Sequence, residues 1–277
     1  MRGKMHIQKT RYSALSAVAL AALLMASCQK EASGSAQTSA AADPDAPTAV
    51  AFAETPPLSA TVAAAPRLVG DSAPIAAINA DLALIDAMAT TSASECEGGG
   101  FARTVTQPMT GPAYVTYMIS DEYDCGGPYP STSQTPVTYD LATGRRVDWT
   151  QALSAWAVTV DATTDQPAGS VGYVHSLALA RWYSAKMLAS TDQEWLEQCR
   201  EVFDPEQLNQ SGFLVWADAG NDGIAVAPQL PHVVQACGEQ AALSAADMQA
   251  AGVPAPMIAA MAKAGEDHNW LPYQEGV

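Results

Sequence analysis

Four cysteines are the clearest candidates for chemistry in this sequence, namely Cys96, Cys125, Cys199 and Cys237. Zinc sites built from cysteine usually need pairs separated by two to four residues, and no two of these cysteines lie that close. The spacing therefore excludes a cysteine metal site, and we predict no metal and no bound cofactor. An even number of cysteines in an exported chain indicates disulfide bonds, and four cysteines allow three pairings.

A fifth cysteine, Cys28, closes a segment that is typical of an export signal. Basic residues without any acidic residue precede an apolar run, 14–26, which is too short to cross a bilayer. Its ending, Leu24 to Cys28, resembles the bacterial lipobox, whose cysteine is acylated and becomes the mature N-terminus. Gln29, rather than Asp, follows it, which favours the outer membrane under lipoprotein sorting rules. We therefore predict a signal peptide at 1–27 and a palmitate-bearing membrane anchor at Cys28, facing the periplasm.

The charge of the chain narrows the range of partners. The 277 residues carry a formal charge of −16, and loss of residues 1–27 would remove four basic residues and no acidic residue, giving −20. Such a chain is repelled by nucleic acid, so nucleic-acid binding is excluded as a function. Basic proteins and cations are attracted to it, although acidity also serves solubility alone.

Composition divides the chain into a tether and one domain. Residues 28–70 are rich in Ala, Ser, Thr and Pro and have few large apolar side chains, so we expect a disordered tether. We expect the folded domain to cover 71–277. At its start, apolar residues from Ile75 to Ala89 recur at spacings of three and four, which predicts one buried face of a helix. Asp71 or Ser72 can cap that helix.

Alternating and helical patterns then follow one another along the domain. Strands are predicted around 101–105, 114–119, 135–141, 145–149, 213–216, 224–226 and 231–237. Helices are predicted around 173–187, 191–203 and 254–261, the second with a capping box formed by Thr191 and Glu194. The predicted fold class is α+β, with an antiparallel sheet and packed helices in a single domain.

Two short motifs suggest catalysis or calcium binding, and each has a simpler interpretation. Gly70-Asp71-Ser72 resembles the nucleophile position of GDS-type esterases, but Gly265 occupies the position three before His268 where such an enzyme has Asp. We favour a helix cap at Ser72 and predict that the protein is not an enzyme. The loop from Asp218 to Gly223 lacks the EF-hand ligands at its third and twelfth positions, which favours a plain turn.

Acidic and aromatic residues gather near a Gly126-Gly127-Pro128 loop. Such residues can stack on sugars, anchor a protein partner or simply cover the end of a sheet. We take an exposed acidic loop as the candidate binding site, comprising Asp121, Glu122, Tyr123, Asp124, Tyr129 and Trp149.

The segment from Cys125 to Pro130, followed by Val137-Thr138-Tyr139-Asp140-Leu141-Ala142-Thr143-Gly144-Arg145, resembles the RsiV-like extracytoplasmic domain. That family includes a lysozyme-sensing anti-sigma factor and domains beside peptidoglycan deacetylases. Tyr129 stands where the family often has His. The resemblance covers about 71–263 and implies an antiparallel α+β domain that binds rather than catalyses. The layout it implies favours disulfides Cys96–Cys125 and Cys199–Cys237.

Three functional hypotheses follow from these observations. The first is an envelope lipoprotein that binds a cationic protein such as lysozyme. The second is a module for peptidoglycan or polysaccharide, with Tyr123, Tyr129 and Trp149 as stacking residues. The third, which we rank far below the others, is a hydrolase that uses Ser72.

Overall fold

The computed structural model describes residues 49–96, 100–126, 129–163 and 165–271, and these form one compact unit. The strands are β1 (Phe52–Ala53), β2 (Arg67–Leu68), β3 (Gly100–Thr110), β4 (Tyr114–Asp124), β5 (Ser131–Asp140), β6 (Arg145–Arg146), β7 (Thr159–Val160), β8 (Val174–His175), β9 (Phe213–Asp218), β10 (Gly223–Pro228) and β11 (Ala241–Leu243). The α-helices are α1 (Ala73–Glu95), α2 (Trp149–Ala152), α3 (Leu177–Leu188), α4 (Gln193–Cys199), α5 (Pro205–Ser211), α6 (Ala245–Ala250) and α7 (Ala255–Glu266). Short 3₁₀ helices are η1 (Ser154–Trp156), η2 (Arg200–Phe203), η3 (Ala219–Asn221) and η4 (His232–Cys237).

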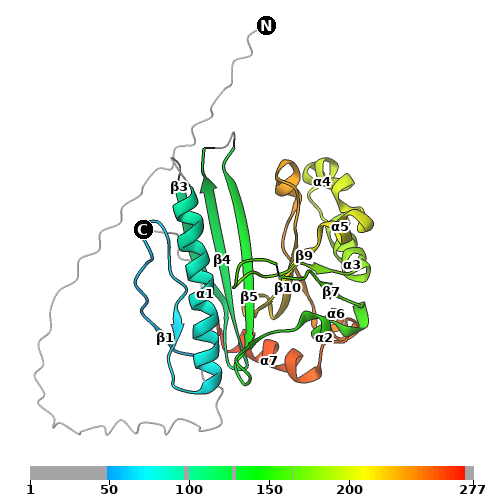
Figure 1. Ribbon diagram of the computed structural model, residues 1–277. Coiled ribbons are helices and arrows are strands. Elements are labelled where there is room, and N and C mark those ends of the chain that lie inside the picture. Colours follow the sequence, from blue (N-terminus) through cyan, green and yellow to red (C-terminus); the bar gives the residue numbers. More distant parts are fainter. Residues whose placement is uncertain (1–48, 97–99, 127–128, 164, 272–277) are drawn as a thin grey trace, which may run out of the picture. The chain divides into compact units, whose positions relative to one another are not determined.

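The predicted α+β class is confirmed, with two larger antiparallel sheets and the two-stranded β1-β2 sheet in place of one sheet. The first sheet has the order β3-β4-β5-β6, and the second has the order β11-β10-β9-β8-β7. Figure 1 shows α1 along one side of β3, β4 and β5, with the second sheet and most of the other helices on the opposite side. The first sheet is therefore a central layer whose two faces meet different neighbours.

Alternation along the long strands of the first sheet sets its two faces. Tyr117, Ile119 and Tyr139 are fully buried against α1 and form one core cluster with the helix residues Ile78 and Leu82. The other face carries smaller and more polar side chains and turns toward the second sheet. Side chains that alternate in this way are the expected signature of a sheet that is buried differently on its two sides.

Helix α1 forms where the spacing of its apolar residues predicts it. Ser72 is the N-cap, and its hydroxyl accepts a hydrogen bond from the backbone N–H of Ile75. By length and composition α1 could also span a membrane. Its carboxylates instead hold arginines of the folded body: Asp86 pairs with Arg67 at 2.7 Å, and Asp81 with Arg146 at 2.6 Å. The helix thus acts as a core helix here.

The ordered body begins earlier than the sequence suggests. Within 49–70, which we expected to be tether, Val62, Ala65 and Leu68 are buried, and β1 pairs with β2. The Ala65 N–H donates to Asp86 of α1 at 3.0 Å, and Arg67 binds the same carboxylate. Backbone and ion-pair contacts thus hold a segment with too few apolar side chains to predict its order. The predicted signal peptide, Cys28 and the rest of the predicted tether lie outside the described residues.

The second sheet and its helices enclose the larger core. The predicted hairpin is confirmed as β9 and β10, whose residues are buried throughout. Phe213, Tyr183 and Phe203 pack edge to face, with the ring centroids of Tyr183 and Phe213 5.6 Å apart. This core contains no residue from α1, although Met109 of β3 belongs to it. A smaller cluster around Trp216 and Ala225 of the second sheet packs against Met118 of β4.

Several predicted elements differ from the structure in type or limits. The 231–237 segment is the 3₁₀ helix η4 rather than a strand, and Pro231, with φ −56° and ψ 146°, is the residue that precedes its first turn. Only Arg145 and Arg146 of 145–149 pair with β5; Trp149 already opens α2. The helix predicted to include Tyr173 starts later, at the N-cap Ser176.

The second predicted helix also begins differently. Asp192, rather than Thr191, is its N-cap, and the carboxylate accepts from the Trp195 N–H at 3.0 Å. Asp and Thr are both good caps, so propensity alone could not decide between neighbours. Asp204 then caps a further helix, α5, that the sequence pattern did not indicate.

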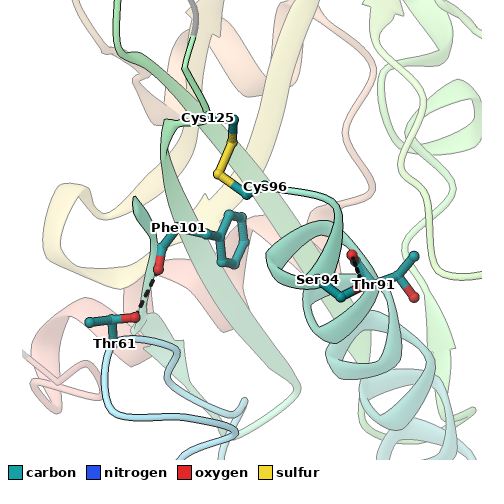
Figure 2. The surroundings of a disulfide bond; sticks show 6 residues. All are labelled: Thr61, Thr91, Ser94, Cys96, Phe101 and Cys125. Carbon is teal, nitrogen blue, oxygen red and sulfur yellow. Dashed lines mark hydrogen bonds between the residues drawn. A yellow bond between two sulfur atoms is a disulfide. The ribbon is translucent and has the colours of Figure 1, made fainter. Parts of the chain in front are cut away.

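Both predicted disulfides are present. Cys96 bonds to Cys125 across 29 residues, and Cys199 bonds to Cys237 across 38 residues. Figure 2 shows the first bond joining the end of α1 to the segment after β4, with the Phe101 ring beside it. The second bond joins α4 to the end of η4, whereas the sequence placed Cys237 on a strand.

Candidate functional site

The acidic residues of the predicted binding loop lie on a strand and do not form a free acidic loop. Asp121 belongs to β4 and is only 6% exposed. Its two oxygens accept from Arg103 Nε at 2.6 Å and Nη2 at 2.8 Å, and Arg103 Nη1 donates to the Ile85 carbonyl of α1. Asp121 is therefore a structural ion-pair residue. Only Glu122 and Asp124, on the opposite face of β4, leave their carboxylates exposed.

The three aromatic residues that we expected to act together are separated. Tyr123 packs against Phe101, with ring centroids 5.1 Å apart. Trp149 follows β6 at the opposite end of the first sheet and packs against the larger core. Eight residues of β4 lie between these two ends, a distance of roughly 25 Å along a strand. Tyr129 alone of the three is strongly exposed, at 75%.

Tyr129 has partners that sequence analysis missed. His232 lies beside it, with ring centroids 6.2 Å apart, and His232 Nε2 is 3.2 Å from the Pro130 carbonyl oxygen. The next residue, Val233, is 89% exposed, the highest value among the large apolar side chains of the described residues. We name Tyr129, His232 and Val233 the outer apolar surface. We had expected Val233 on a strand, where an apolar residue is normally covered.

A cleft of about 710 Å³ opens between the two sheets beneath this surface. One wall is the second face of the first sheet and carries hydroxyl, amide and carboxylate groups, from Thr104, Ser120, Glu122, Thr132 and Gln134. The other wall is mainly aliphatic, from Leu214, Ala227, Pro228 and Leu230. We name this space the inter-sheet cleft.

Contacts at both ends hold the inter-sheet cleft open. At the inner end the sheets touch, where the Ala217 N–H donates to the Thr138 hydroxyl at 3.1 Å. At the outer end Gln235 Nε2 lies 3.4 Å from the Thr132 hydroxyl. The two lips of the cleft end at Cys125 and Cys237, and each of these cysteines is bonded to a helix behind it. The walls are thereby fixed relative to each other.

The exterior is strongly acidic. The described residues include eight Lys and Arg against 24 Asp and Glu. Four of those eight cations are paired with carboxylates: Arg67, Arg103 and Arg146 within the fold, and Lys263 in an exposed pair with Asp267 on α7. Exposed carboxylates gather along α4, η2 and α5, at Asp192, Glu194, Glu197, Glu201, Asp204 and Glu206. This acidic face adjoins η4, because Trp195 Nε1 donates to the Ala236 carbonyl.

The motifs considered for catalysis and calcium have structural roles. The Ser72 hydroxyl caps α1, as predicted. Asp218 is buried and accepts from the Asn221 backbone and amide and from Gln240, which fits the predicted turn. Among the described residues, no group of three or more His, Cys, Asp and Glu side chains is placed to hold a metal ion.

Among the described histidines, His175 has a polar partner at each of its two ring nitrogens. Its Nδ1 lies 2.7 Å from the Asn209 carbonyl oxygen, and its Nε2 lies 3.0 Å from Asp161. Burial by itself lowers the pKa of His175, but the Asn209 carbonyl and the Asp161 carboxylate outweigh that effect and raise the pKa above its ordinary value. This pair ties β8 to α5 and to the segment after β7.

No family model matches this chain, and no curated protein sequence is significantly similar to it. The similarity to the RsiV-like domain therefore stays a prediction based on the motifs around 125–145.

Proposed function

We propose that this chain is a lipid-anchored, non-catalytic binding protein of the bacterial envelope whose partner is a cationic protein. Residues 1–28 support the anchor and the location, and the outer apolar surface carries the proposed contact. Tyr129 and His232 come from segments about a hundred residues apart and yet lie beside each other, and Val233, the residue after His232, is strongly exposed. Each of these segments lies near a disulfide-bonded cysteine, Cys125 or Cys237. Exposed tyrosines on rigid supports are frequent energetic centres of protein interfaces.

Charge supports a basic partner. The acidic face along α4 to α5 begins next to η4, so a protein that covers Tyr129 and Val233 would meet carboxylates at its rim. Complementary charge speeds encounter and selects partners, and salt weakens it because the Debye length is about 10 Å at 0.1 M. Lysozyme is the natural cationic probe, since the RsiV-like resemblance also implies it.

The test is capture of lysozyme by the full-length chain at low and at high ionic strength. We expect binding at low salt that weakens as salt rises. Replacing Tyr129 by alanine should weaken it about tenfold or more, the usual size for an anchor residue. Val233→Ser should also weaken it, whereas the control Val69→Ser, at a 55% exposed position before α1, should not.

Two results would contradict the proposal. One is the absence of lysozyme capture at low salt. The other is capture of insoluble peptidoglycan that persists at high salt while lysozyme is ignored, which would favour the second hypothesis. Equal effects of Val233→Ser and Val69→Ser would remove the outer apolar surface from the interface.

A further inference from the structure

We infer that the inter-sheet cleft is a separate binding site for a neutral oligosaccharide. It does not rest on the proposed protein partner, because Tyr129 and Val233 of the outer apolar surface do not line the cleft, and His232 is the one residue of that surface that does. The inference comes from the chemistry of the two walls, their fixed spacing and the sign of the charge around them.

The polar wall is an ordered array of hydrogen-bonding groups. Thr104, Ser120 and Gln134 stand opposite one another across three neighbouring strands, since Thr104 pairs with Ser120 and Ser120 with Gln134. Two residues further along, Glu122 pairs with Thr132 and forms a second row. Rows two residues apart on a strand are separated by about 7 Å. The hydroxyl and amide groups both donate and accept hydrogen bonds, as sugar hydroxyls do, and the Glu122 carboxylate accepts them.

The facing wall carries the aliphatic side chains of Leu214, Ala227 and Leu230, and polar residues join them only in the segment after β10, at Gln229, His232 and Gln235. A ligand that fits must therefore be polar along one side and apolar along the other. A pyranose ring meets this requirement, because its hydroxyls project from the edge and its C–H bonds form the faces. The volume, about 710 Å³, lies within the usual range for small-ligand sites.

The charge of the cleft lining argues against anionic ligands, and its geometry argues against an added peptide strand. No Lys or Arg is found among the described residues that line the cleft, while Glu122 contributes an exposed carboxylate there. Phosphate-bearing or carboxylate-rich ligands would be repelled without a compensating cation. An extended peptide that adds to a sheet needs an open strand edge, whereas the polar wall here presents the face of a sheet and the facing wall combines residues of β9 and β10 with the following loop and η4.

Contacts within the protein hold the cleft open by themselves. Its inner end is fixed by the contact from Ala217 to Thr138, and its outer end by the contacts of His232 and Gln235 with the β4–β5 hairpin. A site held open in advance avoids the entropic loss of ordering its walls on binding.

Calorimetric titration of the full-length chain, in detergent, with two neutral tetramers tests the inference. The tetramers are of N-acetylglucosamine and of glucose, and the fully deacetylated, cationic glucosamine tetramer is the third probe. We expect at least one neutral tetramer to bind, with an affinity that changes little with salt. Gln134→Leu should weaken binding tenfold or more, and Ser120→Val should weaken it as well.

Gln207→Leu on α5 is the matched control, since Gln207 and Gln134 are both exposed and only Gln134 lines the cleft. Failure of both neutral tetramers to bind would overturn the inference. So would binding of the cationic tetramer alone with loss at high salt, which would indicate attraction to the acidic exterior. Equal effects of Gln134→Leu and Gln207→Leu would also overturn it. Loss of lysozyme binding would contradict only the proposed protein partner.

Discussion

Replacing Asp121 by alanine should destabilise the protein by about 3–5 kcal/mol, because it leaves the Arg103 guanidinium buried without its partner. The side chains of Arg103 and Asp121 are only 5% and 8% exposed, so water cannot replace the lost carboxylate. A protein with about this number of ordered residues should then melt roughly 6–20 °C lower.

The measurement is urea unfolding at neutral pH under oxidising conditions. Glu122→Ala, on the neighbouring exposed residue, should change the free energy of unfolding by less than about 0.5 kcal/mol. The double variant Arg103→Met with Asp121→Leu should recover most of the loss, because a well-packed apolar pair often replaces a buried ion pair without cost. The Arg103 bond to the Ile85 carbonyl would still be missing, which is worth roughly 1 kcal/mol.

A small effect would refute this reasoning. If Asp121→Ala cost less than about 1 kcal/mol, the carboxylate would be behaving as a surface group. The same variant also tests whether Asp121 contributes to partner binding as well as to stability. Because Asp121 faces α1, the folded fraction should capture lysozyme as the unaltered protein does, and a selective loss of capture would return Asp121 to the binding site.

Three further predictions concern stability. Replacing both Cys96 and Cys125 by serine should lower the free energy of unfolding in urea by about 3–4 kcal/mol, because the bond closes a loop of 29 residues. A loss below about 0.5 kcal/mol, the size of a typical surface substitution, would mean that the bond adds little stability. Gly144→Ala should lower the free energy of unfolding by well over about 1 kcal/mol. Gly144 has φ 70°, and a Cβ there would lie 2.5 Å from the Pro74 carbonyl oxygen at the start of α1. A melting temperature unchanged from that of the parent would contradict this prediction. His175, whose folded pKa is raised, should contribute stability that is complete below about pH 6.5 and is lost as pH rises through the folded pKa. Asp161→Asn should therefore lower that pKa in an NMR titration, and an unchanged pKa would exclude Asp161 as a cause.

Local patterns predicted the elements whose stability depends on near neighbours. The three-and-four spacing from Ile75 to Ala89 predicted α1 because a helix aligns residues four apart whatever it packs against. The turn residues from Asp218 to Gly223 predicted the hairpin of β9 and β10 for the same reason.

Interactions between distant segments were harder to infer. Asp121 shares the alternation phase of the buried Tyr117 and Ile119, and Arg103 occupies the matching phase on β3, so the ion pair had a signal in the sequence. The run of acidic residues from Asp121 to Asp124 is also typical of an exposed loop, and that interpretation of the sequence is wrong for Asp121. No comparable signal indicated that residues 49–70 would dock on α1, because few of their side chains are apolar and Asp86 lies outside the segment.

The sequence by itself determined the α+β class, the start of its main helix, the presence of the β9–β10 hairpin and the acidic charge, since these depend on periodicity, composition and the order of elements. The pairing of its cysteines followed from the layout that the RsiV-like resemblance implies, because four cysteines alone allow three pairings. Only the tertiary structure decided which of the candidate residues are exposed and which lie near one another. It buried Asp121, separated Trp149 from Tyr129, exposed Val233 and faced two sheets across a polar cleft. Exposure is fixed by contacts between residues far apart in the chain, and no local pattern contains them.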